Sequence, residues 1–204
     1  IITIETEGDN QWDHGRDLTV ENIKYCDRFQ ILCEKYGIKP TYLVTSEVCE
    51  DSYSQKLFSE YVGENRAEVG AHLHSWTTPP FLPEVGYRQN DEHHIFASEL
   101  NYDLVSRKIR HLTRQITGAI GKVPTSFRSG RYGLNETVVR VLIENDYLVD
   151  SSVTPFVSWS GQRGLPEGKG GPDFIDSSPF PEKYESESGT LIEIPITILP
   201  TIRP

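Results

Sequence analysis

The chain of 204 residues has few cysteines, few cationic side chains and no long apolar segment. No apolar run approaches the ~18–20 residues that cross a bilayer, which excludes a membrane-spanning protein. Cys26, Cys33 and Cys49 form neither a disulfide framework nor a metal-binding knuckle, so a cytoplasmic protein is expected. Twenty Lys and Arg against thirty Asp and Glu give a net charge of −10. This charge argues against a nucleic-acid surface and fits a neutral or cationic substrate.

The length predicts one domain over residues 1–204, because a chain of this size can bury one sizeable core. The sequence begins at Ile1 inside an expected strand and stops at Pro204 soon after another. We therefore expect both ends to be truncated, and the cytoplasmic expectation holds only if no N-terminal signal was removed. The oligomeric state is left open.

Segments with the apolar patterns of strands and helices alternate along the chain. We expect strands near 1–6, 41–44, 67–74, 125–128, 147–151 and 190–196. We expect helices near 20–36, 53–64, 101–120 and 135–145. Residues 75–97 are predicted to form a long loop, and residues 155–190, rich in Gly, Pro and Ser, are predicted to be irregular. Helices between successive strands indicate a mostly parallel sheet, closed or nearly closed into a (β/α) barrel.

Two histidines one residue apart are the most informative feature of the sequence. On a strand His72 and His74 share one face, because side chains alternate. Glu5 and Glu7 repeat this spacing at the end of the first expected strand. Either pair alone is commonly a surface feature, but both end short apolar strands and run into loops, where α/β folds place chemistry. Two imidazoles and a carboxylate are a ligand set for zinc and related divalent ions.

Five segments occur in the order found in the polysaccharide deacetylases of carbohydrate esterase family 4, which this chain resembles over nearly its whole length. The segments are TIETEGD, TYLVTSEV, EVGAHLHSW, SFRSGRYGLN and YLVDSSVTP. The chain looks closest to the divergent WalW-type branch of these NodB-like proteins. The resemblance implies a deformed (β/α) barrel of the deacetylase type, which could be incomplete at the C-terminus, and metal-dependent hydrolysis of a non-peptide carbon–nitrogen bond.

The family uses an acidic pair as base and metal ligand, and two histidines complete its metal site. The resemblance therefore implies that Glu7, His72 and His74 hold a divalent metal. Glu5 is then the general base, although the two glutamates could exchange roles. Asp9 is the next candidate ligand, with a turn or helix-cap aspartate as its alternative. Zinc is the expected metal, and cobalt, nickel and manganese are alternatives.

Further site residues follow from the third and fourth motifs. Arg128 aligns with the arginine that orients the base, and Asp150 matches the aspartate that tunes this arginine. A surface salt bridge and a strand-end turn residue are their alternatives. Trp76, Arg131 and Tyr132 are expected to bind substrate, since aromatic faces stack on sugar rings. The aromatic residues could equally fill packing positions, and Arg131 could simply cover its loop.

The chain departs from the family pattern at three places. Its acids are two glutamates spaced by one residue, which resembles the allantoinase-like members, where the family has adjacent aspartates before glycine. Trp76 stands where the second family histidine would fall. Either His74 replaces that metal ligand, or the second histidine ligand is missing from the site. The fifth motif, with a leucine and a histidine, is not found before Pro204, and no catalytic acid is assigned.

The expected function is N-deacetylation of an acetylated sugar in a surface polysaccharide or its precursor. One alternative is an allantoinase-like amidohydrolase that acts on a small molecule. The other is a catalytically inactive barrel that binds glycan or a protein partner. A bound divalent ion with an open position favours either enzyme over the binding module, and acetate release separates the two enzymes.

Overall fold

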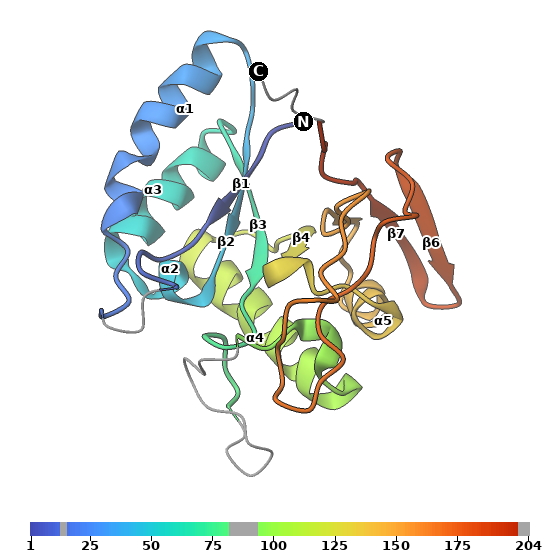
Figure 1. Ribbon diagram of the computed structural model, residues 1–204. Helices are drawn as coiled ribbons and strands as arrows, with labels where there is room; N and C mark the ends of the chain where they lie inside the picture. The colour runs from blue at the N-terminus through green and yellow to red at the C-terminus, as the bar shows by residue number, and fades with distance from the viewer. Residues whose placement is uncertain (13–15, 82–93, 200–204) are drawn as a thin grey trace, which may run out of the picture.

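The computed structural model describes residues 1–12, 16–81 and 94–199, and a seven-stranded sheet forms its centre. The strands are β1 (Thr3–Thr6), β2 (Thr41–Val44), β3 (Glu68–Leu73), β4 (Ser126–Ser129), β5 (Val149–Asp150), β6 (Glu182–Ser186) and β7 (Gly189–Glu193). They lie in the order β1-β2-β3-β4-β5-β7-β6, and all neighbours are parallel except β6 and β7. The predicted α/β fold with a mostly parallel sheet of the deformed-barrel type is confirmed (Figure 1), and β1 and β6 are the edges of the described sheet.

Helices connect the parallel strands from β1 to β5, whereas an irregular segment and β6 lie between the parallel strands β5 and β7. The α-helices are α1 (Cys26–Lys35), α2 (Ser46–Glu50), α3 (Ser52–Gly63), α4 (Tyr102–Ile120) and α5 (Glu136–Glu144), and the short 3-10 helices are η1 (Glu21–Tyr25), η3 (Ala97–Glu99) and η4 (Gly130–Tyr132). Asp51, Asn101 and Asn135 cap α3, α4 and α5, because each side chain accepts a hydrogen bond from the backbone amide three residues on. Gly121 ends α4 with a φ of 82°, which glycine adopts without steric cost.

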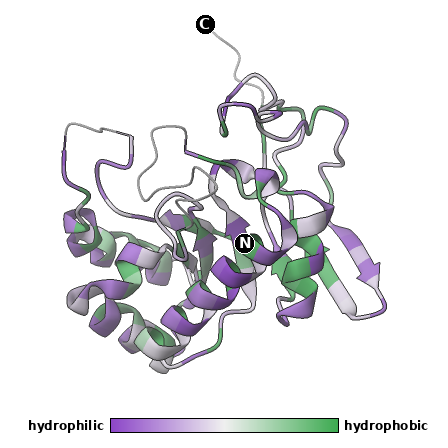
Figure 2. Ribbon diagram, turned by 90° about the horizontal axis from the view of Figure 1, so that it is seen from below, coloured by the Kyte–Doolittle hydropathy of each residue, from purple (hydrophilic) through white to green (hydrophobic). Residues whose placement is uncertain are grey.

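The longest helix shows how the sequence pattern becomes a core. Val105, Ile109, Leu112 and Ile116 form one fully buried stripe on α4, which contacts β3, α3 and α5. Burial of each such side chain contributes about 1.5–3 kcal/mol. In Figure 2, much of the outward side of the helices has the purple colour of hydrophilic residues. The amphipathic helices therefore hold the sheet in place from the face they cover.

The carboxyl ends of the parallel strands lie along one edge of the sheet. The register pairs Thr6 with Val44 and Val44 with Ala71. Leu73 at the end of β3 pairs with Ser129 at the end of β4. The segments that leave β1, β3 and β4 therefore start side by side, which is where α/β folds place ligand sites.

One strand and one α-helix were not predicted, nor were the short helices η3 and η4. β6 lies in the segment that was expected to be irregular, and it pairs antiparallel with β7. Its residues are exposed apart from the half-buried Tyr184, so no apolar alternation marks it as a strand. The helix α2 spans only five residues, too few to show a helical period. Among the described residues, no helix is both long and apolar enough to cross a membrane.

Candidate metal centre

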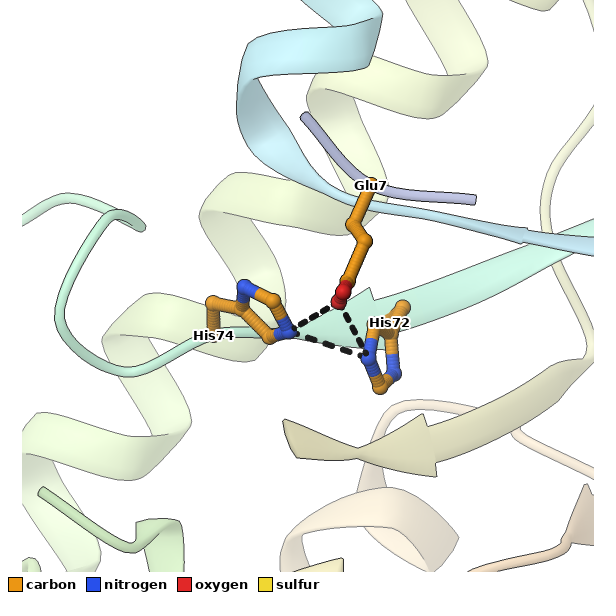
Figure 3. Close-up of side chains that lie close together, drawn as sticks. All are labelled: Glu7, His72 and His74. Carbon is orange, nitrogen blue, oxygen red and sulfur yellow. Dashed lines mark hydrogen bonds and ion pairs between the residues drawn. The ribbon is translucent and has the colours of Figure 1, made fainter. Parts of the chain in front are cut away.

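Three potential ligand atoms converge at the carboxyl edge of the sheet, as Figure 3 shows. Glu7 follows the end of β1, His72 belongs to β3, and His74 follows the end of β3. Glu7 Oε2 lies 2.9 Å from His74 Nε2 and 3.6 Å from His72 Nε2. The two Nε2 atoms are 3.0 Å apart. Within the described residues, this is the one group of three or more His, Cys, Asp or Glu side chains whose ligand atoms all lie within 4.8 Å of one another.

The other nitrogen of each imidazole contacts an oxygen atom. His72 Nδ1 lies 3.0 Å from the backbone oxygen of Arg128, and His74 Nδ1 lies 3.2 Å from Gln11 Oε1. A carbonyl-type oxygen accepts hydrogen bonds and donates none, so both neutral rings carry their hydrogen on Nδ1. Both Nε2 lone pairs then face each other and the Glu7 carboxylate. Because three electron-pair donors without a hydrogen between them repel, this set fits a divalent metal such as zinc.

The charge of Glu7 supports the same reading of the cluster. Burial by itself raises the pKa of Glu7. When the two rings are protonated, Nε2 carries a hydrogen as well as Nδ1, and hydrogen bonds from His72 and His74 together with their positive charge lower this pKa well below its ordinary value. Glu7 is therefore an ionised carboxylate at neutral pH. Metal ligands must be deprotonated, and this residue meets that requirement.

Close packing fixes the position of the His74 ring. Trp76 stacks on it with ring centroids 4.2 Å apart and an angle of 22° between the planes. A Cβ atom at Gly130 would lie 2.6 Å from His74 Cδ2, so this position requires glycine. Trp76 is 1 % exposed, and its ring packs against the imidazole. That Trp76 also forms a wall for substrate stays a prediction.

Arg128 lies on β4 and reaches back toward β1. Its Nη1 atom is 3.5 Å from Glu5 Oε1, within ion-pair distance. Shorter bonds go elsewhere: Nε donates to the backbone oxygen of Ser151 at 2.7 Å, and Nη2 donates to Thr3 Oγ1 at 2.7 Å and Ser151 Oγ at 2.9 Å. The guanidinium group is therefore held by Ser151, which directly follows β5, and by Thr3, the first residue of β1. It offers Glu5 a single longer contact and no bidentate pair.

Asp150 is fully buried and has a partner that the sequence analysis missed. Its carboxylate accepts hydrogen bonds from the Ser152 amide at 3.0 Å and the Ser152 hydroxyl at 2.7 Å. Glu193 on β7 pairs with Asp150 in the register of the sheet, which brings the two acidic residues side by side. Burial raises the pKa of both carboxyl groups, and the charge of Asp150 raises that of Glu193 further. The pair therefore holds a shared proton at neutral pH, near the Arg128 charge.

Three other predicted site residues have separate places. Asp9 Oδ2 accepts from the Asn22 amide at 3.0 Å and from the Thr19 hydroxyl at 3.2 Å, near the start of η1, and Asp9 is not part of the cluster of Glu7, His72 and His74. Arg131 donates to backbone oxygens of the segments after β3 and β5, including that of Arg163 at 3.1 Å, and its guanidinium lies over the Phe96 ring. Arg131 thus connects two loops by hydrogen bonds, which agrees with the alternative that it covers its loop.

Tyr132 borders the site. Its ring stacks on Trp159 with centroids 5.0 Å apart. Burial raises the pKa of Tyr132, and the charge of Glu5 raises it further. Tyr132 has a φ of 61° in the left-handed region, which costs a non-glycine residue roughly 1–2 kcal/mol. Such strained positions are common at functional sites.

Gln11, Glu47 and Glu193 were missed by the sequence analysis. No local pattern marks Gln11, which lies in an irregular segment, or Glu47, which lies on the short α2, and each meets the site only through the fold. A signal existed for Glu193, which stands between two isoleucines in the middle of an expected strand. Its side chain is buried, and a buried acid in a strand indicates a partner.

The chain is similar to several solved protein structures. No family model and no curated protein sequence matches the chain. A Mycobacterium smegmatis structure described as a polysaccharide deacetylase matches with a TM-score of 0.55 and 14% identity, over 84% of this chain and 45% of that one. The BpsB deacetylase domain from Bordetella bronchiseptica matches with a TM-score of 0.51 and 11% identity, over 75% of this chain and 63% of that one.

A pseudoenzyme of carbohydrate esterase family 4 from Bacillus anthracis is also similar, with a TM-score of 0.47 and 18% identity, over 67% of this chain and 41% of that one. The chain thus spans less than half the length of the Mycobacterium smegmatis protein. The WalW-type branch stays a prediction. By the architecture of its sheet and helices, the chain has the fold of the polysaccharide deacetylases.

Proposed function

We propose that this chain carries the site of a metal-dependent hydrolase that removes the acetyl group from an N-acetylated sugar. The observation that carries the proposal is the convergence of Glu7, His72 and His74, with both Nδ1 atoms already engaged. The polysaccharide deacetylase fold supports an acetylated sugar as the substrate class.

Glu7, His72 and His74 would hold the metal, with zinc the best match to two nitrogens and one carboxylate oxygen and with cobalt, nickel and manganese as alternatives. When bound, such an ion supplies the Lewis acidity that polarises an acyl carbonyl and makes water more acidic. The roles of the remaining side chains follow from their own contacts.

Glu5 is the carboxylate left over for proton transfer. It lies two residues before Glu7 on the same face of the chain, and its side chain is one third exposed. Arg128 Nη1 lies 3.5 Å from Glu5 Oε1, close enough to direct the carboxylate that would accept the proton. Arg128 is itself fixed by its bonds to Thr3 and Ser151, so it orients Glu5 from a rigid position.

The test combines metal binding with acetate release. Zinc affinity of the full chain is measured by calorimetry, and acetate release is measured on an N-acetylglucosamine oligomer. We expect zinc binding and acetate release in the wild type, and loss of both in His74→Ala. His111→Ala, a histidine on α4 outside the cluster, is the matched control and keeps both.

Two results contradict the proposal. Hydrolysis of cyclic amides such as allantoin without acetate release identifies a small-molecule amidohydrolase. Zinc binding without hydrolysis of either substrate identifies a binding module.

A further inference from the structure

Gln11 lies between the metal cluster and the helix α2, and it is 7 % exposed. Its Oε1 atom lies 3.2 Å from His74 Nδ1 and 3.2 Å from Trp76 Nε1. Its Nε2 atom lies 2.5 Å from Glu47 Oε1. All the polar atoms of this side-chain amide therefore face polar partners.

The orientation of the amide follows from the chemistry of these partners. The indole nitrogen of Trp76 only donates a hydrogen bond, and both oxygens of Glu47 act as acceptors toward their other neighbours, Gly8 and Thr77. If the amide were turned over, its NH₂ group would face the indole N–H and its oxygen would face the carboxylate. Both contacts would be repulsive, so Gln11 presents its oxygen to Trp76 and His74.

The amide in turn decides which nitrogen of His74 carries the hydrogen. An amide oxygen accepts only, so His74 Nδ1 must be the protonated nitrogen of the neutral ring. His74 Nε2 then keeps its lone pair, directed at Glu7 and His72. For His72 the same result comes from the backbone oxygen of Arg128, which side-chain substitutions leave in place.

Glu47 is held from further directions. Its Oε1 atom also accepts from the Gly8 amide at 3.3 Å, and its Oε2 atom accepts from Thr77 Oγ1 at 3.3 Å. These two donors lie in the segments that leave β1 and β3, the same segments that carry Glu7 and His74. The Glu47 carboxylate therefore ties both parts of the ligand set to α2.

We propose that Gln11, held by Glu47, is a positioning residue that keeps His74 in the tautomer able to bind the metal through Nε2. The inference rests on the proposed metal site. Partners of this kind fix the orientation of a ligating imidazole and typically change metal affinity 10–100-fold when lost.

The first measurement is the tautomer of His74 in zinc-free protein, by nitrogen NMR of histidine-labelled full chain. We expect the wild type to carry the hydrogen on Nδ1, and Gln11→Leu to shift His74 toward the Nε2–H form. Zinc affinity of this variant should fall roughly 10–100-fold. Gln30→Leu is the matched control, because Gln30 is another buried amide that bonds a carboxylate, Glu34, and an aromatic hydroxyl, Tyr42. It should change neither quantity.

A second variant tests the chain of contacts. Gln11→Glu alone places two carboxylates face to face and should lower stability. Combining it with Glu47→Gln reverses the donor and acceptor between the two positions, and most of the zinc affinity should return. This double variant also keeps the test open if Gln11→Leu fails to fold.

The outcomes separate the inference from the proposed function. Absence of zinc binding in the wild type contradicts the proposed metal site, while the tautomer in zinc-free protein still tests Gln11. If the wild type binds zinc and Gln11→Leu keeps both its tautomer and its affinity, the positioning role is overturned and the proposed function stands. Failure of the double variant to recover affinity overturns the part assigned to Glu47.

Discussion

Replacing Glu193 by glutamine should remove a pH dependence from the stability of the protein. Glu193 is 1 % exposed, and its Oε1 atom accepts from the Val153 amide at 3.0 Å. Burial and the charge of Asp150 raise the pKa of Glu193 to about 11. The folded state therefore keeps a proton on this pair at neutral pH, whereas a carboxyl of the unfolded chain ionises near pH ~4.3.

The sign and size follow from proton linkage. Between the unfolded and folded pKa values the folded protein binds one more proton, so its stability is greatest at low pH and falls as the pH rises. The slope is about 1.4 kcal/mol per pH unit, or roughly 3 kcal/mol between pH 5.5 and 7.5. Glutamine cannot ionise, and its NH₂ group can donate to Asp150 in place of the carboxyl proton. Glu193→Gln should thus lack this fall.

Urea unfolding followed by tryptophan fluorescence at pH 5.5, 6.5 and 7.5 measures the difference. Glu187→Gln is the control, because Glu187 is an exposed glutamate in the turn between β6 and β7. It should retain the wild-type slope, since it leaves Glu193 and Asp150 in place. Equal slopes in the wild type and Glu193→Gln would refute the shared proton.

Three further substitutions test the packing and the site. Arg128→Lys keeps the charge but loses the guanidinium hydrogen bonds to Ser151 and Thr3, and should lower the free energy of unfolding in urea by about 3 kcal/mol. An unchanged free energy of unfolding would show that these bonds do not fix Arg128. Gly130→Ala should push the His74 ring and weaken zinc binding at least about 10-fold by calorimetry, and wild-type affinity would contradict this packing. Ile109→Ala should lower stability by about 2–5 kcal/mol with little effect on the zinc affinity of folded protein, and a smaller loss would show that α4 packs less closely.

The regular part of the fold could be predicted because its apolar residues have a period. The stripe from Val105 to Ile116 marks α4, and the run Thr41–Val44 marks β2, which is buried throughout. β6 could not be predicted, since its side chains are mostly exposed and its pairing with β7 supplies the order. Elements that are buried could be predicted, because burial leaves an apolar pattern in the sequence. A strand that is held by backbone pairing alone leaves no such pattern.

The candidate site divides in the same way. The alternation of strand side chains was enough to place His72 and His74 on one face, and parallel strand ends were enough to bring Glu7 near them. Gln11 and Glu47 required the three-dimensional structure, because they are 36 residues apart and meet through a single hydrogen bond. Trp76 was predicted at the substrate from its place beside a motif, and its burial against the His74 ring could be seen only in the three-dimensional structure.

The position of β1 at the edge of the sheet has a consequence for how the protein would lose a metal. β1 has a sheet neighbour on one side, β2, while His72 and His74 belong to the segment of β3, one strand further in. An ion held by Glu7 and both histidines would therefore cross-link the first strand to the third, over the top of the second. β1 could then separate from the sheet only when the ion is released. Added zinc would therefore slow amide hydrogen exchange in β1 more than in any other strand of the described sheet.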